Sequence, residues 1–592
     1  MTVEQSYVFA VLAATLGLFI WGKWRYDVVA VLALLAVGIP GIVTAKDVFA
    51  GFGHPAVITV AAVLVISKTL QASGFVGHIG NVLAKAEVGP SLQVFLVASI
   101  VAALSGFMNN VGALALLLPI VLQMAKKSGR SPRSLLMPLS FGSLLGGLVT
   151  MIGTPPNIIV AAYRQEFSGT PFSMFDFTPV GLVIALAGIL FITFAGWRLI
   201  PNRDAKSGGH TEMFRIDNYI TEVLVPKDSA LIGQTIEHML DLGGEDGVAV
   251  VAQIRRGHRR LGPRPDQLLR SGDHLLLEGE PTEIEGLLAN TKLKTVGTLP
   301  LNLEDLASES IGLVEAVITP QARLVGRTSR QALLGRHYGL NLLAIARHGQ
   351  PIRDRLNRVR FRAGDVLLIQ GDMEAMPDAL ARLGCLPLPH RNIAFDAKSG
   401  IVPLAIFAGA ILSIAFGLLP AAVAFIAVVT AFVLSGATTV RDVYEAIDWP
   451  IVILLGALVP VGGALQMTGG TALLADGIAS LATHISPIWI LVLLMVATMF
   501  LSDIINNAAT AVLMAPLAAE TATRIGANPD PFLMAIAIGS SCAFLTPIGH
   551  QSNVLVMGPG GYRFGDYWPM GLPLEILIVL VSIPALLFFW PL

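Results

Sequence analysis

Long apolar runs fill both ends of this chain and are missing from its middle. A single membrane-spanning helix needs about 20 apolar residues, and no run between residues 199 and 399 approaches that length. The apolar runs lie at about 6–21, 26–43, 55–72, 92–125, 134–162, 178–198, 400–416, 418–435, 450–468, 488–525, 530–556 and 570–591. The pattern predicts an α-helical polytopic membrane protein that carries a soluble insert.

Two of these runs, 92–125 and 488–525, are longer than one span and have a pair of asparagines near the middle. The pairs are Asn109-Asn110 and Asn506-Asn507. Asparagine in hydrocarbon is costly unless its amide finds a partner, so we expect the chain to turn there. Both runs are therefore predicted to be re-entrant hairpins whose tips line a cavity.

The two ends of the chain repeat each other at offsets of 390 to 397 residues. The matching rows are Asp47, Pro55 and Gly74 with Asp442, Pro450 and Gly469; Asn109, Asn110 and Pro119 with Asn506, Asn507 and Pro516; Gly142-Ser143 with Gly539-Ser540; Ile152-Gly153 and Asn157 with Ile548-Gly549 and Asn553; and Asp176, Pro179 and Gly181 with Asp566, Pro569 and Gly571. Each half, 1–199 and 399–592, then has five spans and one hairpin. Because five is odd, the halves are predicted to be inverted repeats, as in many secondary transporters.

The distribution of basic residues predicts the orientation. With both termini outside, twelve Lys and Arg fall on inner loops and helix ends, against three on outer loops (Lys46, Arg164 and Arg524). This orientation places the insert in the cytoplasm and predicts a multi-pass plasma (inner) membrane protein. The first apolar stretch follows Glu4 rather than a basic region, so we expect a first span and no cleavable signal peptide.

Composition agrees with a membrane protein and excludes several other classes. Hydrophobic residues make up 54% of the 592 residues and charged residues 13%, whereas soluble domains carry about 25% charged residues. A net charge of −1 gives no reason to expect a nucleic-acid partner. Two cysteines exclude a disulfide scaffold or a cysteine-rich metal site.

The insert is rich in charged residues and internally duplicated. It holds 22 of the 39 Lys and Arg, between Arg215 and Arg391. Apolar strand-like runs bounded by Gly-Asp turns recur about 92 residues apart, at Gly272-Asp273 and Gly364-Asp365. Helices are predicted at Glu283–Leu288 and Met376–Leu383, which gives two small α/β modules at 213–291 and 306–385. The pair resembles TrkA C-terminal domains, a resemblance that implies either a ligand such as a nucleotide or a role in joining subunits.

Polar residues gather at the hairpin tips and in the Pro-containing spans that follow them. The N-terminus of a hairpin's second arm presents unpaired N–H groups that favour an anion. A broken helix facing it frees carbonyl oxygens, which suit a sodium ion together with Asn and Ser oxygens. The alternative is that the asparagines only join helices by hydrogen bonds, but four clusters in register between the halves make binding the stronger hypothesis.

These clusters resemble the divalent anion:sodium symporters of the ion transporter superfamily. The resemblance rests on Ile152–Asn157, Asn506–Pro516 and, for the sulfate-permease-like branch with TrkA C-terminal domains, Thr546–Asn553 with Gly558–Tyr562. It implies a homodimer that co-transports sodium ions with a small anion. The implied anion-binding residues are Asn109, Asn110, Thr154, Pro155, Asn157, Asn506, Asn507, His550 and Asn553. The implied sodium-binding residues are Ser105, Asn110, Gly153, Ser502, Asn507, Thr546 and Gly549.

Departures from the family pattern bear on the substrate. Asn109 and Asn506 replace the motif serine, while Val111 and Ala508 replace the motif threonine. Without those hydroxyls the carboxylate-binding pattern is incomplete, and asparagine donors suit a compact oxyanion, so sulfate is the first expectation. A dicarboxylate or another oxyanion, with sodium or proton coupling, remains the alternative.

The roles of two ionisable residues are left undecided by the sequence, and two other functional classes are to be compared with a transporter. Asp503 and His550 are intramembrane groups that either take part in binding or only hydrogen-bond to their neighbours. A potassium channel would need filter loops of the TVGYG kind, which the sequence lacks. An enzyme would need clustered catalytic or metal-ligating residues, which Asp503 and His550 alone do not supply, so we expect a transporter and not an enzyme.

Overall fold

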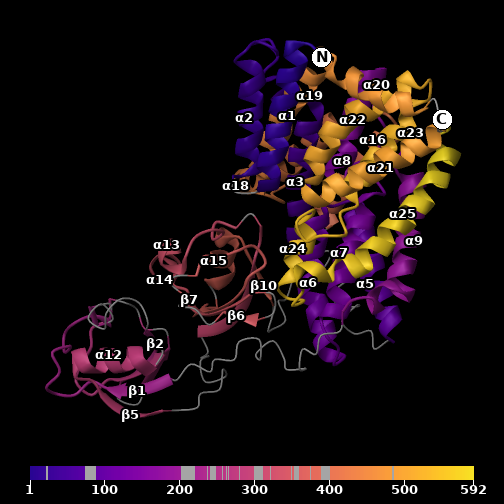
Figure 1. The fold of residues 1–592 in the computed structure, drawn as a ribbon. Helices are drawn as coiled ribbons and strands as arrows, with labels where there is room; N and C mark the ends of the chain where they lie inside the picture. Colours follow the sequence, from indigo (N-terminus) through magenta and orange to yellow (C-terminus); the bar gives the residue numbers. More distant parts are fainter. Residues whose placement is uncertain are drawn as a thin grey trace. The chain divides into compact units, whose positions relative to one another are not determined.

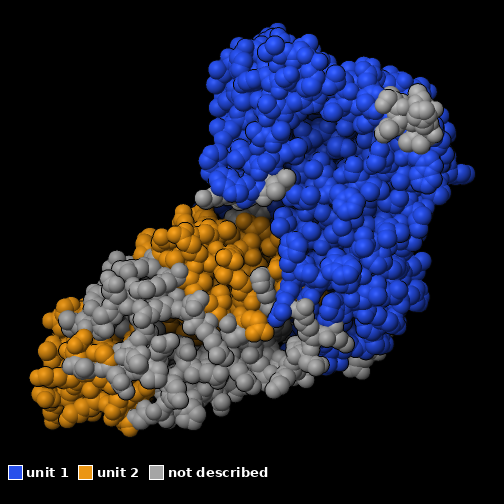
Figure 2. Space-filling model, viewed as in Figure 1, with its two compact units in different colours: residues 1–203, 394–553, 563–592 blue, residues 204–393, 554–562 orange. Residues whose placement is uncertain are grey.

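The computed structural model contains two compact units (Figure 2), and each is described by itself. The first unit combines residues 1–203, 394–553 and 563–592, and the second combines residues 204–393 and 554–562. The structure describes residues 1–21, 24–73, 89–201, 401–482 and 486–592, together with 220–388 except 237, 240–247, 256–257, 262, 264–265, 279–280, 299–310, 321, 348–349, 353–355, 357–358 and 374.

The first unit is helical throughout its described residues (Figure 1). Its first half contains α1 (Val3–Trp21), α2 (Tyr26–Gly38), α3 (Pro55–Ala72), α5 (Pro90–Ser105), α6 (Asn110–Lys127), α7 (Arg133–Gly147), α8 (Pro155–Ser168) and α9 (Thr178–Phe194). Its second half contains α16 (Ile401–Ala415), α17 (Ala421–Leu434), α18 (Val440–Ala446), α19 (Trp449–Met467), α20 (Gly470–Ala482), α21 (Pro487–Ile504), α22 (Asn507–Arg524), α23 (Pro529–Ser541), α24 (Gln551–Met557) and α25 (Trp568–Phe589). Among the described residues, α3, α6, α19, α21 and α25 are long and apolar enough to cross a membrane.

The apolar runs predicted from the sequence coincide with these helices. Each of the two long runs is a pair of helices, α5 with α6 and α21 with α22, and the turn between them falls at the asparagine pair. The runs at 134–162 and 530–556 are each two helices separated by an irregular segment. The structure adds α18 and α20, which the apolar runs did not predict. Gly74, one of the repeated positions, lies outside the described residues.

Each irregular segment is held against the last helix of its own half by a glycine. A Cβ at Gly181 of α9 would lie 2.2 Å from Leu148 O, and a Cβ at Gly571 of α25 would lie 2.3 Å from Phe544 O. Such contacts are too short for any side chain, so both positions require glycine for the helix to approach the backbone. The close approach fixes where the two broken helices sit.

Two buried or half-buried ion pairs join the halves of the first unit. Arg133, at the start of α7, contacts Asp566 at 2.7 Å, and both side chains are at most 10% exposed. Arg164 of α8 contacts Asp530, at the start of α23, at 2.7 Å. Each pair connects a residue before the insert with one after it, so the two pairs hold the halves of the unit together.

The second unit contains two five-stranded antiparallel sheets. The first has the order β3-β2-β4-β1-β5, from β1 (Ile220–Leu224), β2 (Ala249–Arg255), β3 (His258–Leu261), β4 (His274–Glu278) and β5 (Lys294–Thr298), with helix α12 (Pro281–Thr291). The second has the order β10-β6-β9-β7-β8, from β6 (Ile311–Ile318), β7 (Asn341–Arg347), β8 (Gln350–Pro351), β9 (Val366–Asp372) and β10 (Cys385–Leu388), with helices α13 (Ser329–Ala332), α14 (Leu334–Tyr338) and α15 (Met376–Leu383).

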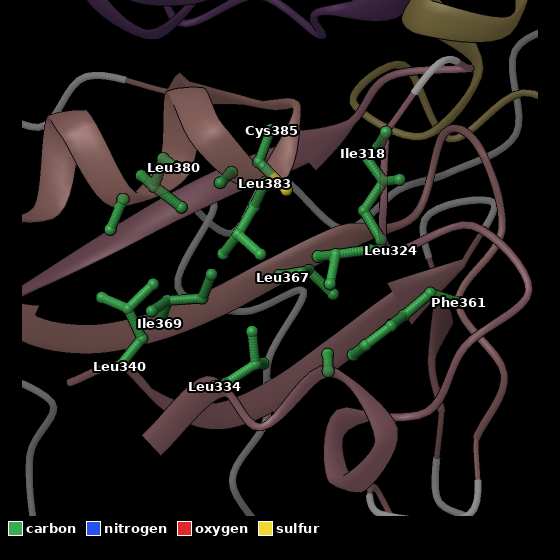
Figure 3. Packing of buried hydrophobic residues seen from close by; sticks show 14 of the residues in the cluster. Ile318, Leu324, Leu334, Leu340, Phe361, Leu367, Ile369, Leu380, Leu383 and Cys385 are labelled. Carbon is green, nitrogen blue, oxygen red and sulfur yellow. The ribbon is translucent and has the colours of Figure 1, made fainter. Parts of the chain in front are cut away.

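The predicted helices at 283–288 and 376–383 correspond to α12 and α15. The predicted module starts, 213 and 306, lie outside the described residues, and the sheets extend past the predicted ends to β5 and β10. The core of the second sheet is built from one face of the strands and from α15, as the side chains of Ile369, Leu367 and Leu380 show (Figure 3).

The duplicated Gly-Asp turns have the same structural role in both sheets. Gly272 and Gly364 have φ values of +84° and +83°, which only glycine adopts without strain. The aspartate that follows is 1% exposed in each case. Asp273 receives two hydrogen bonds from Arg255, at 2.7 and 2.6 Å, and Asp365 receives two from Arg347, at 2.7 and 2.8 Å. The motif therefore marks a buried ion pair that fixes the turn.

The Asp273 pair makes the stability of the first sheet depend on pH. Burial alone would raise the pKa of the Asp273 carboxyl, but hydrogen bonds from Arg255, the Arg270 N–H and Gln253 outweigh it and hold that pKa below its ordinary value. A lowered pKa in the folded state gives stability that is present above the unfolded-state pKa. That stability is lost as the pH falls through the folded-state pKa.

We predict that Asp273→Asn lowers the free energy of unfolding of the first sheet by about 2 kcal/mol at neutral pH, since Arg255 loses its charged partner. Hydrogen exchange of the full-length protein, read on β1, β2 and β4, measures this. The acid-induced loss of protection should be weaker in the variant. The exposed Asp228→Asn is the control, and equal effects of the two substitutions would contradict the assignment.

Candidate functional site

The first asparagine of each pair forms the turn between the hairpin helices. Asn109 Oδ1 accepts the Val111 N–H at 3.1 Å, and Asn506 Oδ1 accepts the Ala508 N–H at 2.9 Å. Both residues are therefore N-caps, which satisfy one of the free N–H groups at a helix start. The caps begin α6 and α22 at the second asparagine and place its side chain at the tip.

Two other predicted site residues, Asn157 and Asn553, hydrogen-bond to backbone carbonyls at the breaks in the helices. Asn157 Nδ2 donates to the carbonyls of residues 147 and 150, at 3.2 and 2.9 Å. Asn553 Nδ2 donates to the carbonyls of residues 543 and 546, at 2.9 and 3.0 Å. The two sets of bonds have the same spacing along the chain. Each amide nitrogen thus satisfies carbonyls that the break leaves without helical partners.

The Asn110 side chain lies among three oxygen atoms of the first half. With its nitrogen facing them, the amide donates to Ser143 O and Gly153 O at 3.1 Å and to Ser105 Oγ at 2.6 Å. The opposite orientation would place the amide oxygen against two carbonyl oxygens, which only accept, so we assign the nitrogen to this position. Two predicted sodium-binding residues, Ser105 and Gly153, therefore converge on one point with Ser143.

His550 reaches the same asparagine from the other half. His550 Nδ1 accepts the Ser552 N–H at 3.1 Å, so a neutral ring carries its hydrogen on Nε2. Nε2 lies 3.4 Å from the outward end of the Asn110 amide, which is the oxygen in the assigned orientation. The donor faces an acceptor, so both assignments agree. Asn110 and His550 lie 440 positions apart in the chain and meet here.

The second half places its predicted residues differently. Asn507 Oδ1 accepts the Ala508 N–H at 2.8 Å, and Ser502 Oγ donates to Ser540 O at 2.5 Å. Thr546 Oγ1 donates to Asp503 O at 2.8 Å and accepts the Gly549 N–H at 3.2 Å. The hydroxyls of Ser502 and Thr546 therefore hold backbone around the second break.

Gly153 and Gly549 both mark close backbone approaches at the breaks. A Cβ at Gly153 would lie 2.5 Å from Gly147 O, and one at Gly549 would lie 2.8 Å from Ser502 O. Pro155 occupies the first turn of α8, where its missing N–H costs nothing. Thr154 directly precedes it, and its Oγ1 is buried with no hydrogen-bond partner. Thr154 thus has a polar atom available for a ligand.

Two carboxyl groups accept N–H groups of the second break. Asp503 Oδ1 accepts from Leu545 at 3.1 Å and Glu575 Oε1 accepts from Phe544 at 3.2 Å. Both side chains are buried, at 4% and 6% exposure. In the first half the corresponding N–H groups, of Leu148 and Val149, bond to backbone carbonyls instead. Asp503 therefore has a structural contact, which the sequence left open, and Glu575 was not predicted at all.

Serine side chains connect the halves beside these breaks. Ser140 Oγ donates to Asn553 Oδ1 at 2.7 Å, and Ser143 Oγ lies 3.4 Å from Ser552 Oγ. Neither Ser140 nor Ser143 was predicted as a site residue. Ser143 had a signal, because it belongs to a Gly-Ser row repeated in the second half, whereas the matching position for Ser140 is Ala537.

The family model for citrate transporters matches residues 16–539 and 486–592 of the chain. The chain belongs to the citrate transporter family. The expected resemblance to the divalent anion:sodium symporters and their superfamily is confirmed, and the protein is a helical polytopic transporter of that anion-transporting family.

Two relatives that align over nearly their full length are described as uncharacterized transporters. One from Synechocystis is 33% identical over 586 residues, covering 97% of this chain and 95% of the relative. One from Escherichia coli is 30% identical, and the alignment covers all of both chains. A sodium/sulfate cotransporter of Chlamydomonas reinhardtii is 28% identical over 397 residues, covering 62% of this chain and 43% of the relative. The solved YdaH transporter of Alcanivorax borkumensis covers 92% of this chain and 87% of its own, with 14% identity and a TM-score of 0.43.

The space for the Asn110 amide depends on Gly147, where a Cβ would lie 2.5 Å from that amide. We predict that Gly147→Ala lowers the free energy of unfolding by about 1–3 kcal/mol through overpacking. Thermal unfolding of the purified protein measures it. Asn110→Ala in the same background should relieve part of the loss, so the double variant tests the contact. Strict additivity of the two substitutions would contradict it.

Proposed function

We propose that this chain is a secondary-active symporter that carries sodium ions together with a small divalent anion, sulfate first, by alternating access. The observation that carries the proposal is the position of the Asn110 amide nitrogen. It lies among two carbonyl oxygens and one hydroxyl oxygen, a ligand set of the kind that a hard cation prefers.

A sodium ion and the Asn110 nitrogen would compete for this position. When the ion takes it, the amide turns so that its oxygen becomes a further ligand of the ion, and its nitrogen is freed toward His550 and the space between the halves. An anion there gains a donor only after the cation has bound. The two ligands then favour each other, which is what coupling requires.

The charges of the site support the need for cations. No Lys or Arg is among the anion-binding residues proposed here, which are Asn109, Asn110, Thr154, Pro155, Asn157, Asn506, Asn507, His550 and Asn553. Donors to the anion would be amides, the His550 Nε2–H and the N-terminal N–H groups of α6, α8 and α22. A divalent anion buried among neutral donors needs about two sodium ions for neutrality. A third sodium ion would make transport electrogenic.

The second cation position is proposed at the other break, around Ser502, Asn507, Thr546 and Gly549. The Asn507 oxygen accepts the N–H of the next residue, Ala508, a local contact that the side chain can give up by turning toward a cation. The paired bonds of Asn157 and Asn553, and the paired packing of Gly181 and Gly571, support inverted repeats of five spans and a hairpin.

Both chain ends lie at the end of the first unit that carries α20 (Figure 1), in keeping with termini on one side of the membrane, which we place outside.

The insert is proposed to be cytoplasmic and regulatory. Its two similar sheets support two TrkA-C-like modules, which would either bind a ligand such as a nucleotide or join subunits. A homodimer in the plasma (inner) membrane, as the family resemblance implies, completes the proposal.

We predict that uptake of labelled sulfate into proteoliposomes requires a sodium gradient and exceeds uptake of citrate, succinate and phosphate. Sulfate affinity should rise with sodium concentration, because binding of either ligand favours binding of the other. Ser105→Ala should weaken sodium more than sulfate, since it removes a cation ligand. A sulfate affinity independent of sodium, with uptake driven equally by a proton gradient in sodium-free buffer, would overturn sodium coupling.

We also predict that Asn110→Ala and Asn507→Ala each reduce uptake by at least about 100-fold while the protein still folds, because each removes a group from the site. Uptake per folded molecule, with folding checked by size-exclusion chromatography, is the measurement. Asn528→Ala, which removes a half-buried cap at the start of α23, is a matched control. Normal uptake by either tip variant would show that the tips do not bind the substrate.

A further inference from the structure

A cavity of about 400 Å³ lies beside the tip of the first hairpin. Its walls come from the end of α3, the end of α5 with the tip that follows, and α16. The lining includes Leu70, Leu104, Phe107, Met108, Phe407 and Leu412. Every lining side chain is apolar, and none belongs to the polar site around Asn110.

The chemistry of the lining excludes water and a polar solute as occupants. A water molecule needs two or more polar partners to be held in a cavity, and none line this one. An empty space of this size would leave its lining without dispersion contacts on one side. The cavity therefore suits an apolar molecule.

The rim of the cavity is continuous with surface that the bilayer covers. Phe107 is 41% exposed and Leu412 is 56% exposed. Ile401, at the start of the same helix as Leu412, and Phe416, directly after its end, are 74% and 77% exposed. An apolar helix of a membrane unit that exposes such side chains faces lipid chains. The molecules next to the open side of the cavity are thus acyl chains.

We propose that this cavity binds one acyl chain of a membrane phospholipid. The chain enters past Leu412 of α16 and packs against Phe107 and Met108. Those two residues directly precede Asn109 and Asn110, and Met108 is only 4% exposed. The lipid chain is then the apolar support behind the hairpin tip. The consequence for transport rests on the proposed function, whereas binding does not.

The test uses the full-length protein in lipid nanodiscs that contain a phospholipid with a photoreactive diazirine on one acyl chain. After irradiation, the cross-linked peptides are mapped by mass spectrometry. Adducts are expected on residues 103–108 and 404–412. Adducts confined to other parts of the surface, with none on these two segments, would overturn the proposal.

Cavity-filling variants make the test specific. Ala408→Phe, on a lining residue of α16, should lower the adduct yield by at least about tenfold, because the ring replaces several methylene groups of the chain. Ala405→Phe adds the same ring to an exposed position of α16 outside the lining and should leave the yield unchanged. An unchanged yield in Ala408→Phe would contradict the site.

A smaller change and a separate readout keep the result decisive. If Ala408→Phe does not fold, Ala103→Leu from the opposite wall should lower the yield by a smaller factor, and no change would overturn the proposal. Sulfate uptake by the same variants is measured in parallel. If the wild type carries no sulfate, the proposed function fails while the adduct map still decides the lipid site.

Discussion

Two asparagine amides that close the broken helices are the interaction on which the membrane unit depends. A helix that stops within hydrocarbon leaves carbonyl groups without partners, and each costs several kcal/mol there. Asn157 and Asn553 satisfy two such carbonyls apiece. With the backbone held in this way, the segment after each break can be irregular and still be buried. The hairpin tips, the serines between the halves and the final helices all pack on those segments.

The same framework carries different chemistry in its two halves. In the first, Gly147 leaves room for the Asn110 amide to enter the group of oxygens. In the second, Ala543 occupies the matching position, and the Asn507 oxygen bonds to its own backbone. The second break also has two carboxyl groups, Asp503 and Glu575, where the first has Gly106 and Ala185. At this second break, the N–H groups of Phe544 and Leu545 bond to the two carboxyl groups instead of to helix carbonyls. Helix α23 therefore ends earlier, relative to the repeated positions, than α7 does in the first half.

The sequence predicted the helices of the membrane unit well, because long apolar runs and an asparagine pair in each long run are local signals. It also predicted which residues lie at the tips and breaks. It could not separate the capping role of Asn109 from the inward-facing role of Asn110, since that depends on side-chain direction. The contact of Asn110 with His550, and that of Ser140 with Asn553, join distant parts of the chain and leave no periodic pattern. In the insert, the sequence showed the two Gly-Asp turns. It did not show that each aspartate pairs with the arginine 18 residues earlier in the chain.

The ion pairs between the halves have a consequence for how such a chain can arise by duplication. At the offset of 397, Arg133 of the first half matches Asp530 of the second, and at 390, Asp566 matches Asp176. Two copies of the first half could pair Arg133 with Asp176 at both ends. Two copies of the second half would bring Asp530 against Asp566, two carboxylates with no cation between them. The charges of the two halves are therefore not interchangeable: two copies of the first half would match in charge at both positions, and two copies of the second would not.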